Sequence, residues 1–552
     1  SGVFNIKSRK VAANQKRFLL GISSINTRLI SEGSFLGNKG SWLVSARRGY
    51  FDLVLKLTEA IEDIPSPFYY DILSRIQYQI SKKHNMLANV LHTKDRLVYE
   101  ENNGGEINNR YGNTCGWLRL ESNFNPRLFI ETVISTGRVD YNRKVRGRYN
   151  RDQNLYYSVS DQRDFRFYGL KQDWNLELCD QYDLKWGLDM KKLNAPYDYL
   201  SEPQNSVQTR NNYRCDTTQV IIRPSGHKFG AYLSNRFRII SPLTMEIGCR
   251  YDYASYTNDK LFSPRFNLVY ALGQQTFIRS GWGHFYQTQG IQELQAQDGE
   301  DTFFPAEFAE HRVIGFEHVF KRGIYIRLEG YCKKLSDLRP AYRNWQQLID
   351  ISPEMSSDRL KILLNGSTAK GIEIYLKKDS GGKLTWWASY ALAYVRDNVV
   401  KIINRDKERQ YNNKELPSVF DQRHTFYFDI NYRPNSKWQF HLAWQYHTGC
   451  PFTKLVPEKL LGFWNEMGEF NSSRYPPYHR MDLRITRHFN IHGGSITAFL
   501  EIVNLYDFRN VACFDYTISY WLDSRLHGIV SKRPEYWFPF LPSIGISWSW
   551  GK

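Results

Sequence analysis

The sequence has no long apolar run. None of its hydrophobic stretches approaches the ~18 consecutive residues that a transmembrane helix requires, and the mean hydropathy is −0.55. The chain therefore does not cross a bilayer as helices. Negative hydropathy does not exclude a membrane, because only alternate residues of a barrel strand need to face lipid.

Cysteine is scarce, and domain linkers are missing. The seven cysteines are scattered, odd in number and without a CxxC pair, which argues against a zinc site and against a dense disulfide framework. No stretch rich in proline, serine or glycine divides the 552 residues, and the composition does not shift along the chain. One large β-architecture fits this chain better than several domains.

The first residues lack the charged segment and apolar core of a secretory signal peptide. Either the protein is intracellular, or the sequence from Ser1 is not the whole primary product. The formal charge of +18 is compatible with nucleic acid, an anionic membrane surface or an anionic ligand. Because much of this charge is interleaved along predicted strands, nucleic acid is the disfavoured partner.

What the sequence has in abundance is the β-hairpin, in a chain of which 15% is aromatic, with 37 Tyr and 15 Trp. Residues 263–272 and 276–286 are predicted strands joined by Gly273-Gln274-Gln275. In the first strand Phe266, Leu268 and Tyr270 alternate with polar or small residues, so one face is apolar. The same unit recurs along the chain, for example at residues 370–378 with 384–395 and at 480–489 with 495–505.

Counting these units predicts about 22 strands, with ends uncertain by ~2–4 residues. Short turns of two to five residues alternate with much longer polar loops. In an up-and-down meander this places the short turns at one end and the long loops at the other, which is typical of an outer-membrane barrel with its short turns in the periplasm. No motif repeats at a fixed period, which argues against a propeller or solenoid.

Single strands show the alternation that a membrane barrel needs. Ile324, Ile326 and Leu328 alternate with Tyr325, Arg327 and Glu329. An arginine facing lipid near the midplane costs ~2–4 kcal/mol, so Arg327 and Glu329 are predicted to face the lumen. In the last strand Ile544, Ile546, Trp548 and Trp550 alternate with Gly545, Ser547 and Ser549.

Several segments together resemble a TonB-dependent receptor, an outer-membrane transporter. SPRFNLVYALGQQTFIRSGWGHFYQ at 263–287 is similar to the family's mid-barrel hairpin, and GIEIYLKK at 371–378, DQRHTF at 421–426 and FLEIVNLYDFRNV at 499–511 are similar to its later strands. Residues 544–550 resemble the aromatic closing strand of the barrel, although here Gly551 and Lys552 follow the last aromatic.

The resemblance also assigns the start of the chain. GVFNIK at residues 2–7 is similar to the strand that ends the family's plug domain. It implies that residues 1–10 are a remnant of the plug, that residues 11–552 form the transmembrane barrel, and that the segment contacting TonB lies upstream of Ser1. Family members bind a scarce, bulky nutrient outside the cell and import it with energy from the inner membrane.

Two stretches are candidate ligand-binding loops. The basic loop 142–151 carries Arg143, Lys144, Arg146, Arg148 and Arg151, which suit an anionic ligand; contact with lipopolysaccharide phosphates or simple solvation is the favoured alternative. In the loop 287–300 the candidates are Gln287, Gln289 and Glu293, because extracellular loops of the family close over ligand.

No catalytic constellation is present, so the chain is not predicted to be an enzyme, and no cofactor or metal is implied. His311 with His318, or His441 with His447, are conceivable metal ligands, but girdle or lumen positions are the favoured interpretation.

The sequence thus predicts the barrel of an outer-membrane active-transport receptor. Its ligand is a ferric siderophore, cobalamin, glycan or peptide, and its partners are the outer membrane with its lipopolysaccharide and the TonB complex. The alternative is a surface barrel that acts as an adhesin or docks a partner lipoprotein.

Overall fold

The computed structural model describes residues 11, 16–50, 66–100, 105–150, 153–204, 217–345, 352–356, 358–379, 381–404, 407–457, 465–522 and 526–551. Within these residues, no helix has the length and apolar character to cross a membrane.

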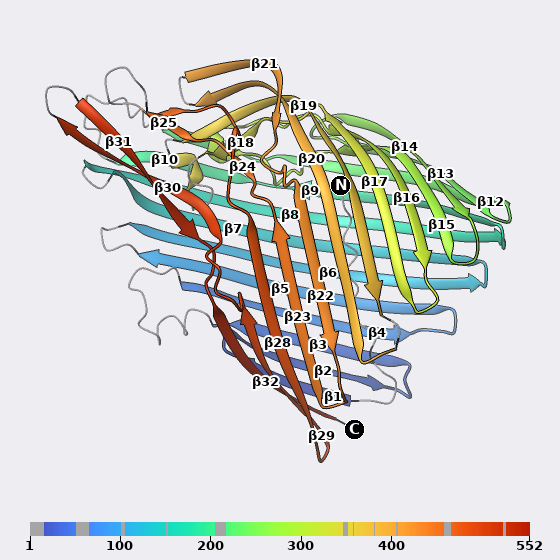
Figure 1. Ribbon diagram of the computed structural model, residues 1–552. Coiled ribbons are helices and arrows are strands. Elements are labelled where there is room, and N and C mark those ends of the chain that lie inside the picture. The colour runs from blue at the N-terminus through green and yellow to red at the C-terminus, as the bar shows by residue number, and fades with distance from the viewer. Residues whose placement is uncertain are drawn as a thin grey trace.

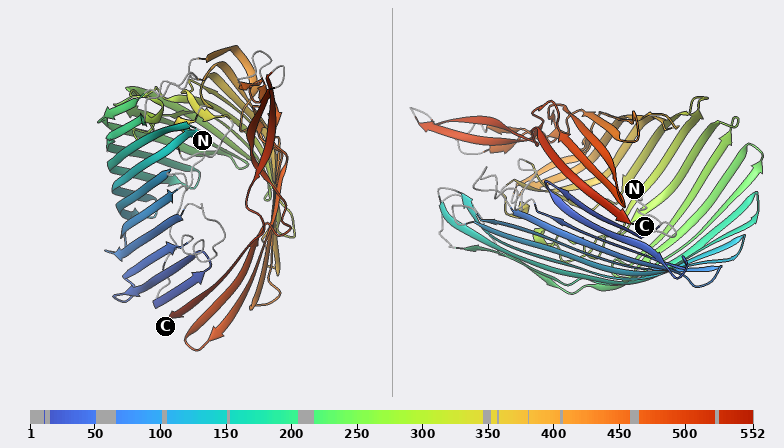
Figure 2. Two further views of the ribbon diagram at one scale, coloured as in Figure 1. Left: turned by 90° about the vertical axis from the view of Figure 1, so that its left-hand side faces the viewer. Right: turned by 90° about the horizontal axis from the view of Figure 1, so that it is seen from below.

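The chain forms a closed antiparallel barrel of 22 strands (Figures 1 and 2), which confirms the predicted fold class. Each barrel strand pairs with the next one in the ring, and β1 pairs with β32 to close it. The barrel strands are β1 (Lys16–Ser23), β2 (Asn26–Phe35), β3 (Gly40–Gly49), β4 (Ser66–Gln79), β5 (His84–Glu100), β6 (Glu106–Asn125), β7 (Leu128–Asn150), β8 (Gln153–Cys179), β9 (Tyr182–Asn194), β12 (Ser225–Ile240), β13 (Leu243–Ala254), β14 (Asp259–Ala271), β15 (Thr276–Gln287), β16 (Glu307–Val319), β17 (Ile324–Ser336), β19 (Arg359–Lys378), β20 (Leu384–Asn404), β22 (His424–Tyr432), β23 (Trp438–His447), β28 (Tyr478–Ile491), β29 (Gly494–Val503) and β32 (Leu541–Gly551).

The seam between the first and last strands is continuous over seven residue pairs, from Arg17 opposite Gly551 to Ser23 opposite Gly545. On its outer side the rings of Phe18 and Trp550 stack with centroids 5.8 Å apart. On its inner side Arg17 Nε donates to Ser549 Oγ at 2.9 Å. Closure leaves no unpaired barrel edge, which is the condition for placing a sheet in lipid.

The two ends of the barrel differ as predicted. At one end every connection is short: residues 36–39, 80–83, 126–127, 180–181, 241–242, 272–275, 320–323, 379–383, 433–437 and 492–493. At the other end most connections are long, as at 195–224, 288–306, 337–358, 448–477 and 504–540. Some strands are also long, such as β7 with 23 residues and β8 with 27. A strand needs only ~9–11 residues to cross the bilayer, so these strands continue above the membrane.

The two faces of the barrel wall also differ as predicted. Large apolar side chains such as Ile134 (56% exposed) and Ile314 (62%) project from the outer face, where they meet lipid. On the inner face Arg327 pairs with Glu329 at 3.4 Å and Arg279 pairs with Glu317 at 2.9 Å. Period-two alternation of the strands produces both faces.

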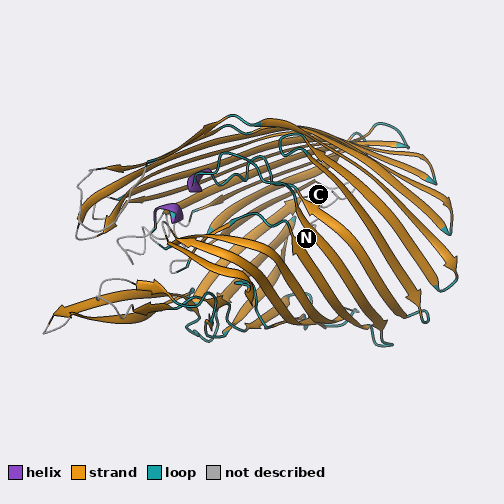
Figure 3. Ribbon diagram, turned by 90° about the horizontal axis from the view of Figure 1, so that it is seen from above, coloured by secondary structure: helices purple, strands orange, loops and turns teal. Residues whose placement is uncertain are grey.

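Shorter strands and two short helices lie at the long-loop end. β10 (Tyr197–Gln204), β11 (Thr218–Ile222), β18 (Ala341–Asn344) and β21 (Lys407–Pro417) extend the main sheet, and β24 (Pro451–Phe452), β25 (Leu455–Pro457), β26 (Asn465–Met467) and β27 (Ser473–Arg474) form two small ladders. β30 (Val511–Leu522) and β31 (Leu526–Tyr536) form a separate hairpin that projects from this end (Figure 2). Two 3-10 helices, η1 (Ala296–Asp298) and η2 (Pro353–Met355), lie within the mouth (Figure 3).

Leu328 lies on the outer face, opposite Phe316 and Ile374. A substitution there tests whether this face of the barrel meets lipid. The native barrel is expected to migrate faster on a cold gel in mild detergent than after boiling, as closed barrels resist the detergent. Leu328→Arg places a guanidinium in lipid at a cost of ~2–4 kcal/mol and is expected to reduce the folded band.

Tyr331→Arg, on the lumenal side of the same strand, is the matched control and is expected to assemble normally. Normal assembly of Leu328→Arg, or identical migration before and after boiling, contradicts the barrel in lipid.

Candidate ligand-binding mouth

The mouth at the long-loop end is narrowed by segments that fold against the inner wall. Connections 288–306 and 337–358 and the β10–β11 hairpin pack together, and we call them the inner loop cluster. Ile291, Leu294 and Ala296 of the first connection are fully buried. They pack against residues of the wall and hairpin: Val145, Val159, Leu193, Ala195, Tyr197, Tyr199 and Val220.

Tyr197 fixes the backbone of connection 288–306. Its hydroxyl donates to the carbonyl of Ile291 at 2.8 Å and accepts from the N–H of Leu294 at 3.2 Å. Burial raises the pKa of Tyr197 to about 12, so the hydroxyl stays protonated and keeps donating. Arg163, over the Tyr197 ring, also donates to Gln297 Oε1 at 2.7 Å.

A buried ion-pair network joins connection 337–358 to the barrel wall. Arg143 on β7 is 5% exposed; it lies 3.4 Å from Asp161 on β8 and donates through both Nη atoms to Glu354 in η2. Tyr199 donates to the same Glu354 carboxylate at 3.2 Å. Burial, and then the Glu354 charge, raise the pKa of Tyr199. Since a buried charge without a partner is strongly unfavourable, the network holds η2 against the wall.

The two connections are also tied to each other. Arg359 at the start of β19 binds both carboxylate oxygens of Asp298 in η1, at 2.9 and 2.6 Å. Tyr342 donates to Glu300 Oε1 at 2.9 Å. Burial raises the pKa of Glu300. The inner loop cluster is therefore one packed unit.

A second apolar cluster, formed by Leu360, Ile362, Val399, Ile402, Leu416 and Phe470, joins β19–β21 to connection 448–477. Asp421, fully buried in the DQRHTF segment, anchors this connection: it accepts from the N–H of Val395 at 2.8 Å and from Arg423 at 3.0 Å, and it pairs with Arg474. Burial by itself raises the pKa of Asp421, but the Val395 N–H and the two guanidinium groups outweigh it and lower the pKa.

The interpretation of residues 142–151 as a loop is wrong, because β7 continues to Asn150 and pairs with β8. The strand alternation sends Arg143 into the buried network and leaves Lys144 and Arg146 exposed on the outer face. Arg148 lies in β7, and Arg151 lies outside the described residues. Arg143, Lys144 and Arg146 therefore do not share one loop.

Of the three candidates in 287–300, Gln289 and Glu293 belong to the inner loop cluster, and Gln287 directly precedes it. Gln287 is the exposed last residue of β15. Gln289 is 2% exposed and accepts from the N–H of Phe304 at 2.8 Å, so it shapes the connection. Glu293 accepts from the N–H of Gly290 at 2.8 Å and lies 3.6 Å from Arg339, with half of its side chain exposed to the mouth.

The histidine pairs do not converge. His311 and His318 are seven residues apart on β16, so they lie on opposite faces. His441 pairs with Asp429 at 2.7 Å, while His447, six residues further along β23, stacks on Tyr478. In the part of the chain that the structure describes, no three His, Cys, Asp or Glu side chains are grouped to hold a metal.

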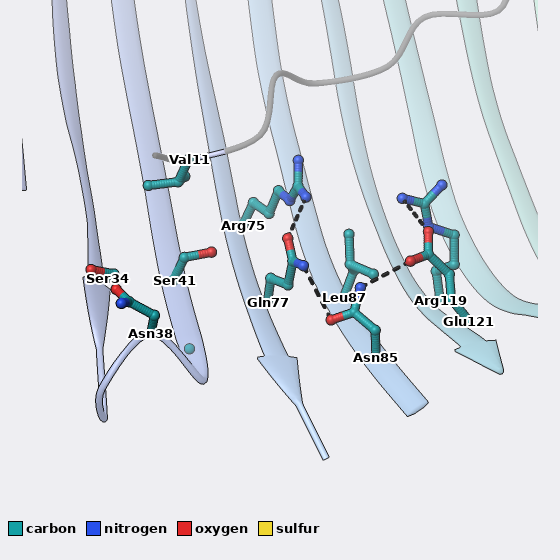
Figure 4. Close-up of a pocket in the computed structure, with 11 residues that line it drawn as sticks. Val11, Ser34, Asn38, Ser41, Arg75, Gln77, Asn85, Leu87, Arg119 and Glu121 are labelled. Carbon is teal, nitrogen blue, oxygen red and sulfur yellow. Dashed lines mark hydrogen bonds and ion pairs between the residues drawn. The ribbon is translucent and has the colours of Figure 1, made fainter. Parts of the chain in front are cut away.

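A polar pocket lies on the lumenal wall between β2 and β6, near the short-turn end (Figure 4). Its hydrogen bonds form a chain: Arg75 donates to Gln77 at 2.8 Å, Gln77 to Asn85 at 3.1 Å, and Asn85 to Glu121 at 2.9 Å. Val11, ahead of β1, lines the same pocket, so this residue lies against the lumenal wall.

Sequence reasoning missed the partners that organise the mouth. Asp161 had only an approximate signal: counting back from the pair Asn150 and Gln153 places Ser160 opposite Arg143, and a register shift between Arg148 and Asn150 brings Asp161 to that position instead. Glu354 had none, since it lies 211 residues from Arg143 in an irregular connection. Asp421 lay within a noted motif, but its partner Arg474 is 53 residues away.

A family model for TonB-dependent receptor-like β-barrels matches residues 38–505. No curated protein matches the sequence. Among solved structures, the unliganded ferric citrate transporter FecA aligns over 99% of this chain and 80% of its own at a TM-score of 0.63 and 12% identity.

Two further solved structures share the fold. The copper transporter OprC aligns over 100% of this chain and 82% of its own, with a TM-score of 0.66 and 12% identity. Pseudomonas aeruginosa FpvA bound to a heterologous pyoverdine with iron aligns over 99% and 72%, with a TM-score of 0.66 and 11% identity.

The Arg143 network gives a test of mouth order. Glu354→Gln leaves Arg143 buried without its main counter-charge, a change that costs about 3–5 kcal/mol. We expect connection 337–358 to detach, seen as faster hydrogen exchange and proteolysis there while the barrel band is unchanged.

Glu408→Gln is the matched control, because Glu408 pairs with Lys401 at 3.1 Å on an exposed site and such pairs contribute only about 0–1 kcal/mol. Equal exchange in the Glu354 variant and the wild type rules out the anchoring role.

Proposed function

We propose, because the chain belongs to the TonB-dependent receptor β-barrel family, that it is the barrel of an importer driven by the inner-membrane TonB complex. The protein is an outer-membrane barrel, and lipopolysaccharide surrounds it in the outer leaflet of that membrane. The imported ligand is a scarce, bulky nutrient captured at the mouth.

The ordered mouth is the observation that carries this proposal. A barrel of this width encloses a large lumen, and a receptor needs a shaped entrance to select its ligand. The inner loop cluster supplies one, held in place by the buried Glu354 with Arg143 of the wall and by the buried Asp298 with Arg359. Glu293 and Gln287 stand at its accessible edge, and we propose them as ligand contacts in place of the basic segment.

The ligand belongs to one of four classes: ferric siderophore, cobalamin, glycan or peptide. Ferric citrate and a ferric pyoverdine are named with two of the structural neighbours, and the net charge of +18 favours an anionic ligand. An anionic iron chelate is therefore our first choice.

Residues 1–10 are proposed to be the end of a plug domain, with residues 11–552 as the barrel. Residues 1–10 lie outside the described residues; the position of Val11 against the lumenal wall supports the proposal, because a plug would occupy the lumen. Contact with TonB is proposed to occur through residues upstream of Ser1.

A docking platform for a surface lipoprotein is the second candidate. The β30–β31 hairpin favours it, because it forms a sheet of its own outside the barrel ladder. Phe514 packs on Phe452 and Tyr475, and a two-stranded hairpin depends on such packing for stability in water. A bound partner accounts for such an arm.

The test is uptake by cells that express the full-length gene product. A deletion strain and its complemented parent are supplied in turn with a ferric siderophore, cobalamin, a glycan and a peptide as the limiting nutrient. We expect loss of uptake of one class on deletion, rescue by the intact gene, and abolition by a protonophore.

A complementing gene without residues 511–536 separates the two candidates. Retained uptake with loss of a copurifying lipoprotein assigns docking to the hairpin and import to the barrel. If deletion of the whole gene leaves the uptake of all four nutrient classes unchanged, the proposal that the protein is an importer is wrong.

A further inference from the structure

Exposed cations cover the outer wall of the barrel between β5 and β7, above the apolar belt. We call this set the basic outer wall; its members are Lys94, Arg96, Arg110, Lys144 and Arg146, all of them exposed. Each has the same parity along its strand as an exposed apolar residue lower down, Val90 on β5, Leu118 on β6 or Ile134 on β7. The five cations therefore face outward, away from the lumen.

The cations begin where the apolar belt ends. On β7 the outward positions from Leu128 to Thr136 span nine residues, the length that crosses a bilayer, and the next outward residue is Arg138. On β5 Lys94 is the first cation above Val90. The basic outer wall thus starts at the level of lipid headgroups.

The neighbouring pair Arg138 and Arg166 shows what this wall does with an anion. The two arginines are directly opposite each other on β7 and β8, an arrangement that is unfavourable for like charges. Asp164 lies between them and accepts from Arg138 Nε at 3.0 Å and from Arg166 Nη2 at 2.5 Å. One carboxylate therefore satisfies both guanidinium groups.

Arg96 and Arg110 form the same arrangement without the anion. They are directly opposite each other on β5 and β6, and Arg110 Nε donates to the amide oxygen of Asn108 at 3.2 Å. Within the described residues, no carboxylate pairs with either arginine, or with Lys94, Lys144 or Arg146. Among the side chains that the structure describes between β5 and β7, the acidic residues on this face are Glu106 opposite Arg146 and Asp140 opposite Gly112, and they make no ion pair with the five.

We propose that the basic outer wall binds the phosphate groups of the anionic glycolipid of the outer leaflet, with one phosphate between Arg96 and Arg110. Side chains directly opposite each other start from Cβ atoms ~4.5–5.5 Å apart, so two guanidinium groups reach one phosphate, which they bind in paired hydrogen bonds. The lipid is favoured over a soluble phosphate because its acyl chains lie on the apolar belt directly below. The proposal rests on the outer-membrane location and is independent of import.

The test uses the purified full chain in neutral detergent with bisphosphorylated lipid A as the probe, and bound lipid is counted by native mass spectrometry. Arg96→Gln/Arg110→Gln is expected to bind lipid A roughly tenfold more weakly than the wild type. Both side chains are exposed, so the heat-shifted band is expected to match the wild type.

The matched control is Lys260→Gln/Lys370→Gln, which removes two exposed outward charges from β14 and β19. It is expected to retain wild-type affinity. An equal loss in both double variants indicates diffuse attraction and overturns the site. Should the arginine double variant not assemble, Arg110→Gln against Lys260→Gln carries the same comparison.

Two ligand controls identify the chemistry. Lipid A stripped of both phosphates is expected to bind no better to the wild type than to the arginine variant; tighter binding to the wild type overturns the phosphate assignment. Inorganic pyrophosphate is expected to compete poorly. If it binds as tightly as lipid A, the ligand is a soluble phosphate and the lipid assignment is wrong.

Discussion

The backbone hydrogen bonds of the barrel must all be made within the protein, because the hydrocarbon core offers no water. Pairing of β1 with β32 meets this requirement. A strand at an open edge exposes a row of unpaired N–H and C=O groups, so the whole wall depends on a contact between residues more than 500 positions apart. The last strand lies between β29 and β1 and completes two ladders at once.

Closure in turn makes the side-chain alternation decisive. Once the sheet is a cylinder, odd and even residues of a strand face either lipid or lumen. The charge of +18 is therefore compatible with a membrane protein, because charged residues such as Arg484 and Glu501, 2.6 Å apart, are paired on the inner face. Arginine and glutamate on the lumen side cost little, whereas an arginine that faces lipid near the midplane costs ~2–4 kcal/mol.

The same alternation divides the basic segment NRKVRGRYNR between two roles. Arg143 enters the mouth and holds Glu354, whereas Lys144 and Arg146 remain on the outer wall. The composition of this segment suggested a loop, because the part of a strand above the membrane does not face lipid and lacks the alternating apolar residues that identify a membrane strand. Its charges serve two different neighbourhoods because consecutive side chains of a strand point in opposite directions.

The sequence by itself determined the architecture: the strand number, the two unlike ends and the lipid face all follow from local period and turn composition, as at residues 263–286. The tertiary structure alone decided the mouth. The register shift between Arg148 and Asn150, which brings Asp161 rather than Ser160 opposite Arg143, is visible only in the structure. Glu354 and Arg474 meet Arg143 and Asp421 across long connections. Local periodicity carries no information about such contacts, because the path of an irregular loop is set by the burial and charge pairing that it finds in the folded barrel.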